Sequence, residues 1–132
     1  METKSTKHSV YNINYHIVFC PKYRHSVLRG GIEVYLKRLF KNICDHYGYD
    51  LLEIETMSDH VHLFISAKPT VAPVTIVHAL KSISTVWVFK KLPGLKRRKF
   101  WGSGLWSKGY YVGTAGTVSA ETIRKYIEGQ KT

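Results

Sequence analysis

The stretch YDLLEIETMSDHVHLFISA, Tyr49 to Ala67, decides the fold. Its first part, Tyr49–Met57, reads as a β-strand, and its last part, His60–Ala67, reads as another. Only the short segment from Met57 to Asp59 connects them. Within the second strand Val61, Leu63 and Ile65 point one way, so they are expected to face the core.

Two elements are predicted before this pair of strands. Tyr11–Cys20 alternates apolar and polar residues up to Pro21, which predicts a strand with one buried face. Ile32–Tyr47 carries its apolar residues at helical spacing and is followed by Gly48, a common helix stop.

Three elements are predicted after it. Pro73 opens a helical segment that ends by Pro93-Gly94. Leu105–Val112 is predicted to be a fourth strand, and Ala120 to about Gln130 a final helix. The order is therefore βαββαβ plus a helix. This order favours an α+β, ferredoxin-like or RRM-like sandwich, with two helices on one face of a four-stranded antiparallel sheet.

Size and composition indicate one domain over residues 1–132, with a sheet-and-helix core at 9–113 and a last helix at 117–132. No apolar run approaches the roughly 20 residues that span a bilayer. No signal peptide is recognisable, so we expect a cytoplasmic protein. Cys20 and Cys44 form no CxxC pattern, which argues against a disulfide framework or a zinc site.

Charge gives the first functional indication. Twenty Lys and Arg against nine Asp and Glu leave a formal net charge of +11, which favours a polyanion such as nucleic acid. A ribosomal or merely soluble basic protein would share this excess. The shortage of acids argues against enzymes that cluster carboxylates around two metal ions.

His60 and His62 alternate with the apolar residues of their strand, so both imidazoles are expected on the open face of the sheet. There they could bind one metal ion, or simply be polar residues on a solvated face. Asp59 could orient a histidine from outside the ligand set, or be a turn residue. His16 is expected to project to the same face, where it is a second candidate, with Asp59, for orienting a metal-binding histidine; a partly exposed polar position is the simpler interpretation.

The last helix places Tyr126 and Gln130 four residues apart, on one face. Near the open sheet they could present a phenol and an amide oxygen to the same metal. The same spacing fits an ordinary packing stripe, so it does not by itself make Tyr126 a nucleophile.

These residues together resemble the single-tyrosine HUH transposases of the smallest insertion sequences, the insertion-sequence 200/605 family. Three blocks in the right order carry the resemblance, and they cover nearly the whole chain. They are YHIVFCPKYRH (15–25), SDHVHLFI (58–65), and LWSKGYYVGTAG followed by VSAETIRKYIEGQ (105–130).

The resemblance implies a mechanism. Tyr126 would attack a phosphate of single-stranded DNA at the end of a mobile element, leaving a 5′-phosphotyrosine and a free 3′-hydroxyl. The hydroxyl of another strand would later attack the phosphotyrosine linkage and reseal the DNA. His60, His62 and Gln130 would hold Mg²⁺ or Mn²⁺. Exchange of one phosphodiester for another requires no ATP, and the chain has no phosphate-binding GxxxxGK[ST] loop.

The resemblance also implies partners: single-stranded DNA with hairpin ends, and a second subunit in a homodimer whose sites combine histidines of one chain with the tyrosine of the other. No membrane partner is expected. Cations interleaved with aromatics are the candidate DNA contacts, although a solvated basic loop would look the same. They are Lys22, Tyr23, Arg24, Lys96, Arg97, Arg98 and Lys99.

Three rivals remain open on the sequence. An RRM-like module would bind single strands without cutting them, although such modules carry aromatics where this chain carries His60 and His62. A rolling-circle initiator or relaxase would share the chemistry but serve another task. A degenerate copy would fold without moving DNA.

Overall fold

The computed structural model describes residues 12–100, 104–114 and 120–130. Within these ranges a four-stranded sheet runs in the order β2-β3-β1-β4, and every neighbouring pair is antiparallel. The strands are β1 (Ile13–Phe19), β2 (Asp50–Met57), β3 (His60–Ala67) and β4 (Tyr111–Thr114). The predicted α+β sandwich is confirmed, with β3 and β1 at the centre of the sheet.

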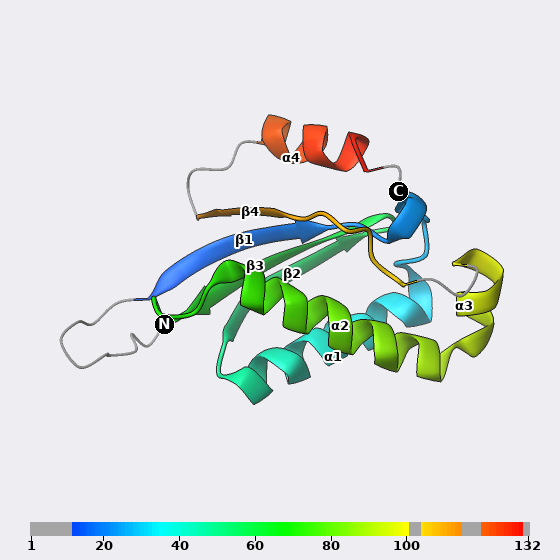
Figure 1. Ribbon diagram of the computed structural model, residues 1–132, viewed down its shortest axis with the longest axis horizontal. Helices are drawn as coiled ribbons and strands as arrows, with labels where there is room; N and C mark the ends of the chain where they lie inside the picture. Colours follow the sequence, from blue (N-terminus) through cyan, green and yellow to red (C-terminus); the bar gives the residue numbers. More distant parts are fainter. Residues whose placement is uncertain (1–11, 101–103, 115–119, 131–132) are drawn as a thin grey trace.

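Two long helices cover one face of the sheet (Figure 1): α1 (Gly30–Tyr47) and α2 (Pro73–Lys91). The helix α1 ends as the sequence predicts, because Gly48 adopts the left-handed conformation at φ 77°. The core lies between these helices and the sheet, and Val61, Leu63 and Ile65 of β3 are fully buried there. The predicted facing of β3 is therefore confirmed.

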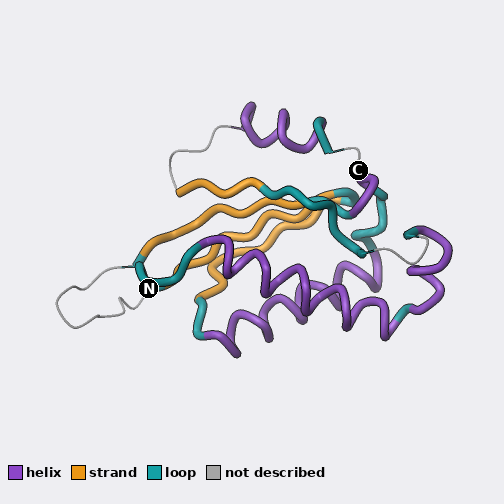
Figure 2. Tube along the Cα trace, viewed as in Figure 1, coloured by secondary structure: helices purple, strands orange, loops and turns teal. Residues whose placement is uncertain are grey.

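The opposite face of the sheet carries α4 (Ala120–Glu128), which lies across it in Figures 1 and 2. This arrangement corrects the prediction that β1 has only one buried face. Val18 is fully buried and His16 is 7% exposed, although both point away from α1 and α2. The alternation of β1 marks its core side correctly, but it carries no information about a helix that packs on the other side.

The predicted fourth strand is wrong in its limits, since β4 spans only Tyr111–Thr114 and not Leu105–Val112. Leu105 and Trp106 are buried in the core instead. The indole Nε1 of Trp106 donates to Ser84 Oγ of α2 at 2.8 Å. The segment pairs with the residues just after β1 and not with the strand itself: Ser107 N–H donates to the Cys20 carbonyl at 3.0 Å, and Trp106 forms an isolated bridge with Pro21.

The second helical segment begins at Pro73 and ends before Pro93-Gly94, as predicted, but the short helix after it was not predicted. The helix α2 ends at Lys91, and the separate short helix, α3 (Pro93–Lys99), follows. Pro93 explains the break, because proline starts a helix well but cannot continue one. A single 3₁₀ turn, η1 (Lys22–Arg24), follows β1, which ends at Phe19 rather than Cys20. Tyr11, with which the predicted first strand begins, lies outside the described residues, and so does Gly116, the last residue of the block LWSKGYYVGTAG.

No helix in the described ranges is both long and apolar enough to cross a bilayer. Both cysteines are free thiols in the core. Burial raises the pKa of Cys20 to about 11 and that of Cys44 to about 12, so both thiols stay protonated and unreactive at neutral pH.

Candidate active site

Two histidines of β3 lie side by side on the face of the sheet that α4 covers. His60 and His62 alternate with the buried residues of the strand, and their ring centroids are 4.9 Å apart. The central position of β3 in the sheet fixes their backbone on both sides. The predicted juxtaposition of the two imidazoles is therefore present.

Each of these rings has its Nδ1 atom engaged by a neighbour. His60 Nδ1 lies 2.9 Å from Asp59 Oδ1, and His62 Nδ1 lies 3.0 Å from His16 Nε2. With both Nδ1 atoms occupied, the Nε2 atom of each ring is left for a ligand. Histidines that bind metal ions are commonly held in this way by a partner on the second ring nitrogen.

His16 lies in β1, paired with Phe64 of β3 across the sheet. Its ring stacks on Phe64 at a centroid distance of 4.2 Å. The prediction that His16 shares the histidine face is confirmed, but the interpretation as a partly exposed residue is wrong, because its ring is almost completely enclosed.

Burial favours the uncharged form of His62 and of His16. Desolvation lowers the pKa of His62 to about 4, and repulsion from His60 and His16 contributes in the same direction. Burial also lowers the pKa of His16, although the nearby Glu55 carboxylate opposes the shift. A neutral imidazole is the form that binds a metal ion.

A pocket of about 500 Å³ opens above the two histidines, between the sheet and α4. Its lining residues are Arg24, Asp59, His60, His62, Arg124, Ile127 and Glu128. Within the described ranges, no three His, Cys, Asp or Glu side chains converge as a complete metal site. The two imidazoles alone therefore leave most of an ion's coordination positions to other donors.

Arg24 joins the histidine strand to the last helix. Its Nε lies 3.2 Å from Asp59 Oδ2, and a terminal nitrogen of its guanidinium donates to the carbonyl of Ile127 at 3.3 Å. Arg24 and the preceding Tyr23 both adopt positive φ, at 52° and 60°. Left-handed backbone at non-glycine residues costs on the order of 1 kcal/mol each. The contacts of the Arg24 guanidinium with Asp59 and Ile127 offset part of this strain.

Tyr126 and Gln130 share a face of the last helix segment, as predicted, but that face is turned away from the histidine pocket. The Gln130 amide oxygen lies 3.2 Å from Ser107 Oγ. A Cβ at Gly109 would lie 3.5 Å from the same oxygen and 3.9 Å from the Tyr126 ring. The structure brings Tyr126 and Gln130 together, but it does not bring either to His60 and His62.

The hydroxyl of Tyr126 is enclosed, and burial raises its pKa further above the ordinary value for a phenol. Cys20 contributes to this increase, while Ser107 opposes it. In this position the phenol is neutral and therefore a weak nucleophile.

Lys81 of α2 holds the loop on which Tyr126 and Gln130 rest. Its ammonium donates to the carbonyls of Ser107 and Gly109 at 2.8 and 2.7 Å. Burial lowers its pKa to about 8. Sequence reasoning missed this residue, because nothing in the local pattern of α2 distinguishes Lys81 from a solvated lysine.

The candidate DNA contacts fall on two segments that meet in space. Lys96, Arg97, Arg98 and Lys99 are all exposed on α3. The next residue, Phe100, is buried and packs edge-on against His25, just after η1. Phe100 is therefore a core anchor, and it joins the basic helix to the segment that carries Lys22, Tyr23 and Arg24.

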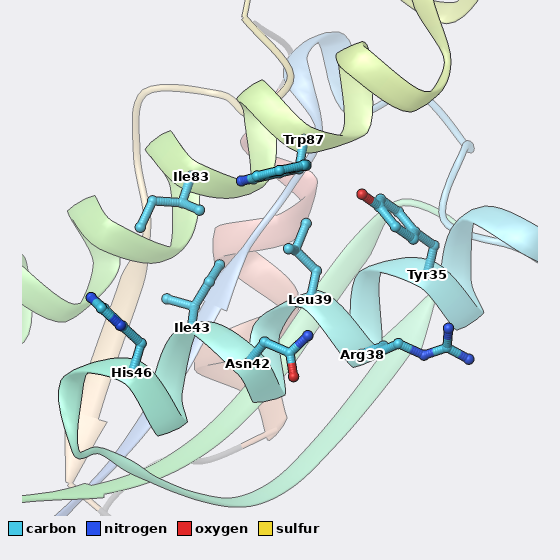
Figure 3. A pocket seen from close by; sticks show the side chains of 8 residues that line it. All are labelled: Tyr35, Arg38, Leu39, Asn42, Ile43, His46, Ile83 and Trp87. Carbon is cyan, nitrogen blue, oxygen red and sulfur yellow. The ribbon is translucent and has the colours of Figure 1, made fainter.

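A second pocket, of about 410 Å³, lies between α1 and α2 (Figure 3). Leu39 and Ile43 of α1 line it from one side, and Ile83 and Trp87 of α2 from the other. Because α1 and α2 cover the face of the sheet opposite α4, this pocket is separate from the histidine site.

Comparison with known proteins decides which family this site belongs to. The family model described as "Transposase IS200 like" matches residues 9–130. The chain belongs to the IS200-like transposase family. The matched span includes the histidine strand and the helix that carries Tyr126, so both halves of the candidate site are family sequence.

Two curated relatives agree with this family. The chain is 39% identical over 130 residues to the ISDra2 transposase TnpA of Deinococcus radiodurans, covering 98% of this chain and 92% of that protein. It is 31% identical over 129 residues to the transposase for insertion sequence element IS200 of Salmonella typhimurium, covering 98% and 84%.

Solved structures agree with the fold of this transposase. A crystal structure of a protein from Deinococcus radiodurans R1, described as a transposase, superimposes with a TM-score of 0.86 at 36% identity, covering 98% of both chains. A REP-associated tyrosine transposase, solved bound to a REP hairpin, superimposes with a TM-score of 0.58 at 11% identity, covering 96% of this chain and 70% of that one. The second likeness is one of fold alone.

Proposed function

We propose that this transposase cleaves and rejoins single-stranded DNA at the ends of an insertion sequence, with Tyr126 as nucleophile and a divalent metal ion at His60 and His62. The observation that carries the proposal is the histidine pair. Two imidazoles, each engaged at Nδ1, face a pocket whose other wall is the tyrosine-bearing helix.

The donor set fits a divalent metal ion. The Nε2 atoms of His60 and His62 would be two ligands, and the Gln130 amide oxygen would be a third once the last helix presents it. Bound Mg²⁺ or Mn²⁺ would draw charge from the phosphate oxygens and stabilise the transition state. Imidazole nitrogens suit Mn²⁺ better than Mg²⁺.

The chain's own residues would then carry out an exchange of phosphodiesters. The Tyr126 phenol oxygen attacks the scissile phosphorus and loses its proton. The new bond from oxygen to phosphorus forms as the bond to the 3′-oxygen breaks, and that oxygen leaves as a 3′-hydroxyl. The 5′-phosphotyrosine keeps the energy of the broken bond, so a later 3′-hydroxyl can reverse the step without ATP.

Tyr126 has to leave its contact with Gly109 before this reaction, because it does not line the histidine pocket of its own chain. Tyr126 would then act together with the histidine pair of a partner subunit, in a homodimer with two shared sites.

The DNA would approach over a surface that is rich in cations. His25, Arg29 and Lys99 line one pocket of about 350 Å³, beside the exposed cations of α3. Cations beside aromatic rings suit a phosphate backbone with unpaired bases. The hairpin in the REP-associated relative supports a hairpin as part of the proposed substrate.

A cleavage assay tests this proposal. Single-stranded DNA from the element's own flanks, with its hairpin, is incubated with the protein and Mn²⁺ or with chelator, then separated on a denaturing gel. A DNA-linked protein band is expected only with metal ion, and not with Tyr126→Phe or His62→Ala. Tyr110→Phe is the matched control, since Tyr110 is 37% exposed and lies outside the histidine pocket. Binding of this DNA without any adduct would contradict the proposal.

A further inference from the structure

We propose that His16 is a positioning residue, whose Nε2 accepts a hydrogen bond from His62 and so holds His62 in the tautomer that presents Nε2 to a metal ion. This inference rests on the proposed function for the identity of the site. It adds a role for His16, which lies in the neighbouring strand β1 and outside the His60–His62 pair.

Strand pairing places His16 where it can act on His62. His16 lies opposite Phe64 and His62 lies opposite Val18, so the two histidines are diagonal neighbours on one face of the β1–β3 pair. Their facing atoms, His16 Nε2 and His62 Nδ1, are 3.0 Å apart. This separation is a normal hydrogen-bond distance between two nitrogens.

Packing holds the His16 ring in this orientation. The ring is 7% exposed, and it stacks on Phe64 with an interplanar angle of 14°. Tyr111 of β4 contacts it edge-on at a centroid distance of 6.5 Å. Neighbours from β3 and β4 therefore restrict the ring, which gives His62 a fixed partner.

A single proton must lie between the two nitrogens. If His62 carries it on Nδ1, its Nε2 has a free lone pair and can bind a metal ion. If His16 carries it on Nε2, then neutral His62 is protonated on Nε2 and cannot bind through that atom. Only the first arrangement is compatible with a ligand role for His62, and it requires His16 to be the acceptor.

His60 has an equivalent arrangement. The Asp59 carboxylate can only accept when ionised, so His60 Nδ1 donates to it at 2.9 Å and Nε2 is left free. His62 lacks a carboxylate partner at Nδ1, and His16 takes that place. The two rings then present the same atom, Nε2, from adjacent outward positions of β3.

The test begins with the tautomer of His62 in the metal-free protein at pH 7, read from the ring ¹⁵N shifts and couplings in NMR. The expected result is a proton on Nδ1 of His62 and none on Nε2. A proton on Nε2 of His62 would overturn the inference. This measurement needs no activity, so its answer does not depend on whether the protein cleaves DNA.

The second arm measures Mn²⁺ affinity by calorimetry for His16→Phe and His16→Gln. Phenylalanine keeps the stacking on Phe64 but removes the acceptor, so we expect a loss of affinity of about 10- to 100-fold. Glutamine places an amide oxygen at a similar reach, so it should retain most of the affinity. His78→Phe, at an exposed position of α2, is the control.

The outcomes separate the two claims. Unchanged Mn²⁺ affinity in His16→Phe, with wild-type binding that His62→Ala abolishes, would overturn the role of His16 alone. Failure of the wild-type protein to bind Mn²⁺ would overturn the proposed metal site, while the tautomer measurement would still decide whether His16 holds His62.

Discussion

At the scale of single residues, the histidine site depends on what surrounds each ring. His60 and His62 occupy equivalent positions of β3, yet one has a carboxylate partner and the other an imidazole. This difference matters because a carboxylate stabilises a protonated ring, whereas a neighbouring imidazole in a buried cluster does not. His62 is therefore the residue whose titration should be most unusual.

We predict that His62 titrates near pH 4 in the metal-free protein, because desolvation lowers its pKa to about that value. The unfolded chain binds this proton near pH 6.5. The unfolded state therefore gains protons first as the pH falls, and the stability contributed by His62 is lost between pH 6.5 and about 4. NMR titration of the His62 ring is the measurement, and a midpoint near 6.5 would show that the ring is not desolvated.

A second prediction concerns the buried hydrogen bond that fixes the segment before β4. Ser84→Ala removes the acceptor of the Trp106 indole and leaves a buried N–H unsatisfied. The free energy of unfolding should fall by about 1–3 kcal/mol, measured by urea denaturation. Ser82→Ala, on the exposed side of the same helix, is the matched control and should change it by less than about 0.5 kcal/mol. Equal effects of the two changes would refute this account of the segment.

At the scale of elements, one side chain links α4 directly to the start of β3. Arg24 reaches both Asp59, at the start of β3, and the carbonyl of Ile127 in α4. The sequence predicts that Arg24 is a DNA contact. Its contacts in the structure give it a second role, which is to join β3 to α4. Arrival of a DNA phosphate at the pocket would compete with Asp59 and Ile127 for the same guanidinium.

We therefore predict that Arg24→Met loosens the last helix without unfolding the protein. Amide hydrogens of α4 should exchange up to roughly fivefold faster, since a half-exposed ion pair contributes about 1 kcal/mol or less. Mass-spectrometric hydrogen exchange of the α4 peptide is the measurement. Arg38→Met on α1 is the control, and an unchanged α4 in Arg24→Met would mean that other contacts hold the helix.

The elements also show how far the sequence could predict this fold. The period-two alternation of β3 is strong, and both its limits and its facing were predicted correctly. The limits of β4 could not be predicted, because Leu105 and Trp106 are as apolar as strand residues, but they lie opposite the turn that follows β1, where only an isolated bridge joins Trp106 to Pro21. The short α3 was missed because a seven-residue helix offers little periodicity to detect.

The candidate site also has one part that local sequence patterns predict and another that they do not. His60 and His62 share a strand, so local alternation predicts that they meet. The contact of His16 with His62 depends on the register between β1 and β3, which local patterns do not contain. The contact of Tyr126 and Gln130 with the loop that Lys81 holds is also long-range. Their helical spacing was correct, but it could not predict which surface their shared face contacts.

At the scale of the whole molecule, the sheet separates two surfaces with different chemistry. The two long helices α1 and α2 cover one face, and α4, which carries Tyr126, lies over the other (Figure 1). His60 and His62 lie on the face under α4, where they line a pocket together with Ile127 and Glu128. Within one chain, Tyr126 faces Ser107 and Gly109 rather than the histidine pocket. Tyr126 has to leave this position in either case, and it would then meet the histidines of its own chain or those of a partner subunit.

Mixing two inactive variants distinguishes these cases. Tyr126→Phe keeps the histidines, and His62→Ala keeps the tyrosine, so neither alone should form an adduct with DNA. If the sites are shared between subunits, mixed dimers contain one intact site and should recover up to about a quarter of wild-type adduct when subunits exchange at random. No recovery, in a mixture shown by native mass spectrometry to contain mixed dimers, would place Tyr126 with its own histidines.

The central claim is that Tyr126 is the nucleophile of this transposase. The most direct measurement is to digest the adduct formed with Mn²⁺ and single-stranded DNA by protease and nuclease, then locate the nucleotide by mass spectrometry. The account predicts a 5′-linked nucleotide phosphate on the peptide that contains Tyr126, together with a free 3′-hydroxyl on the released strand. A nucleotide on another residue, or a linkage through a 3′-phosphate, would contradict it.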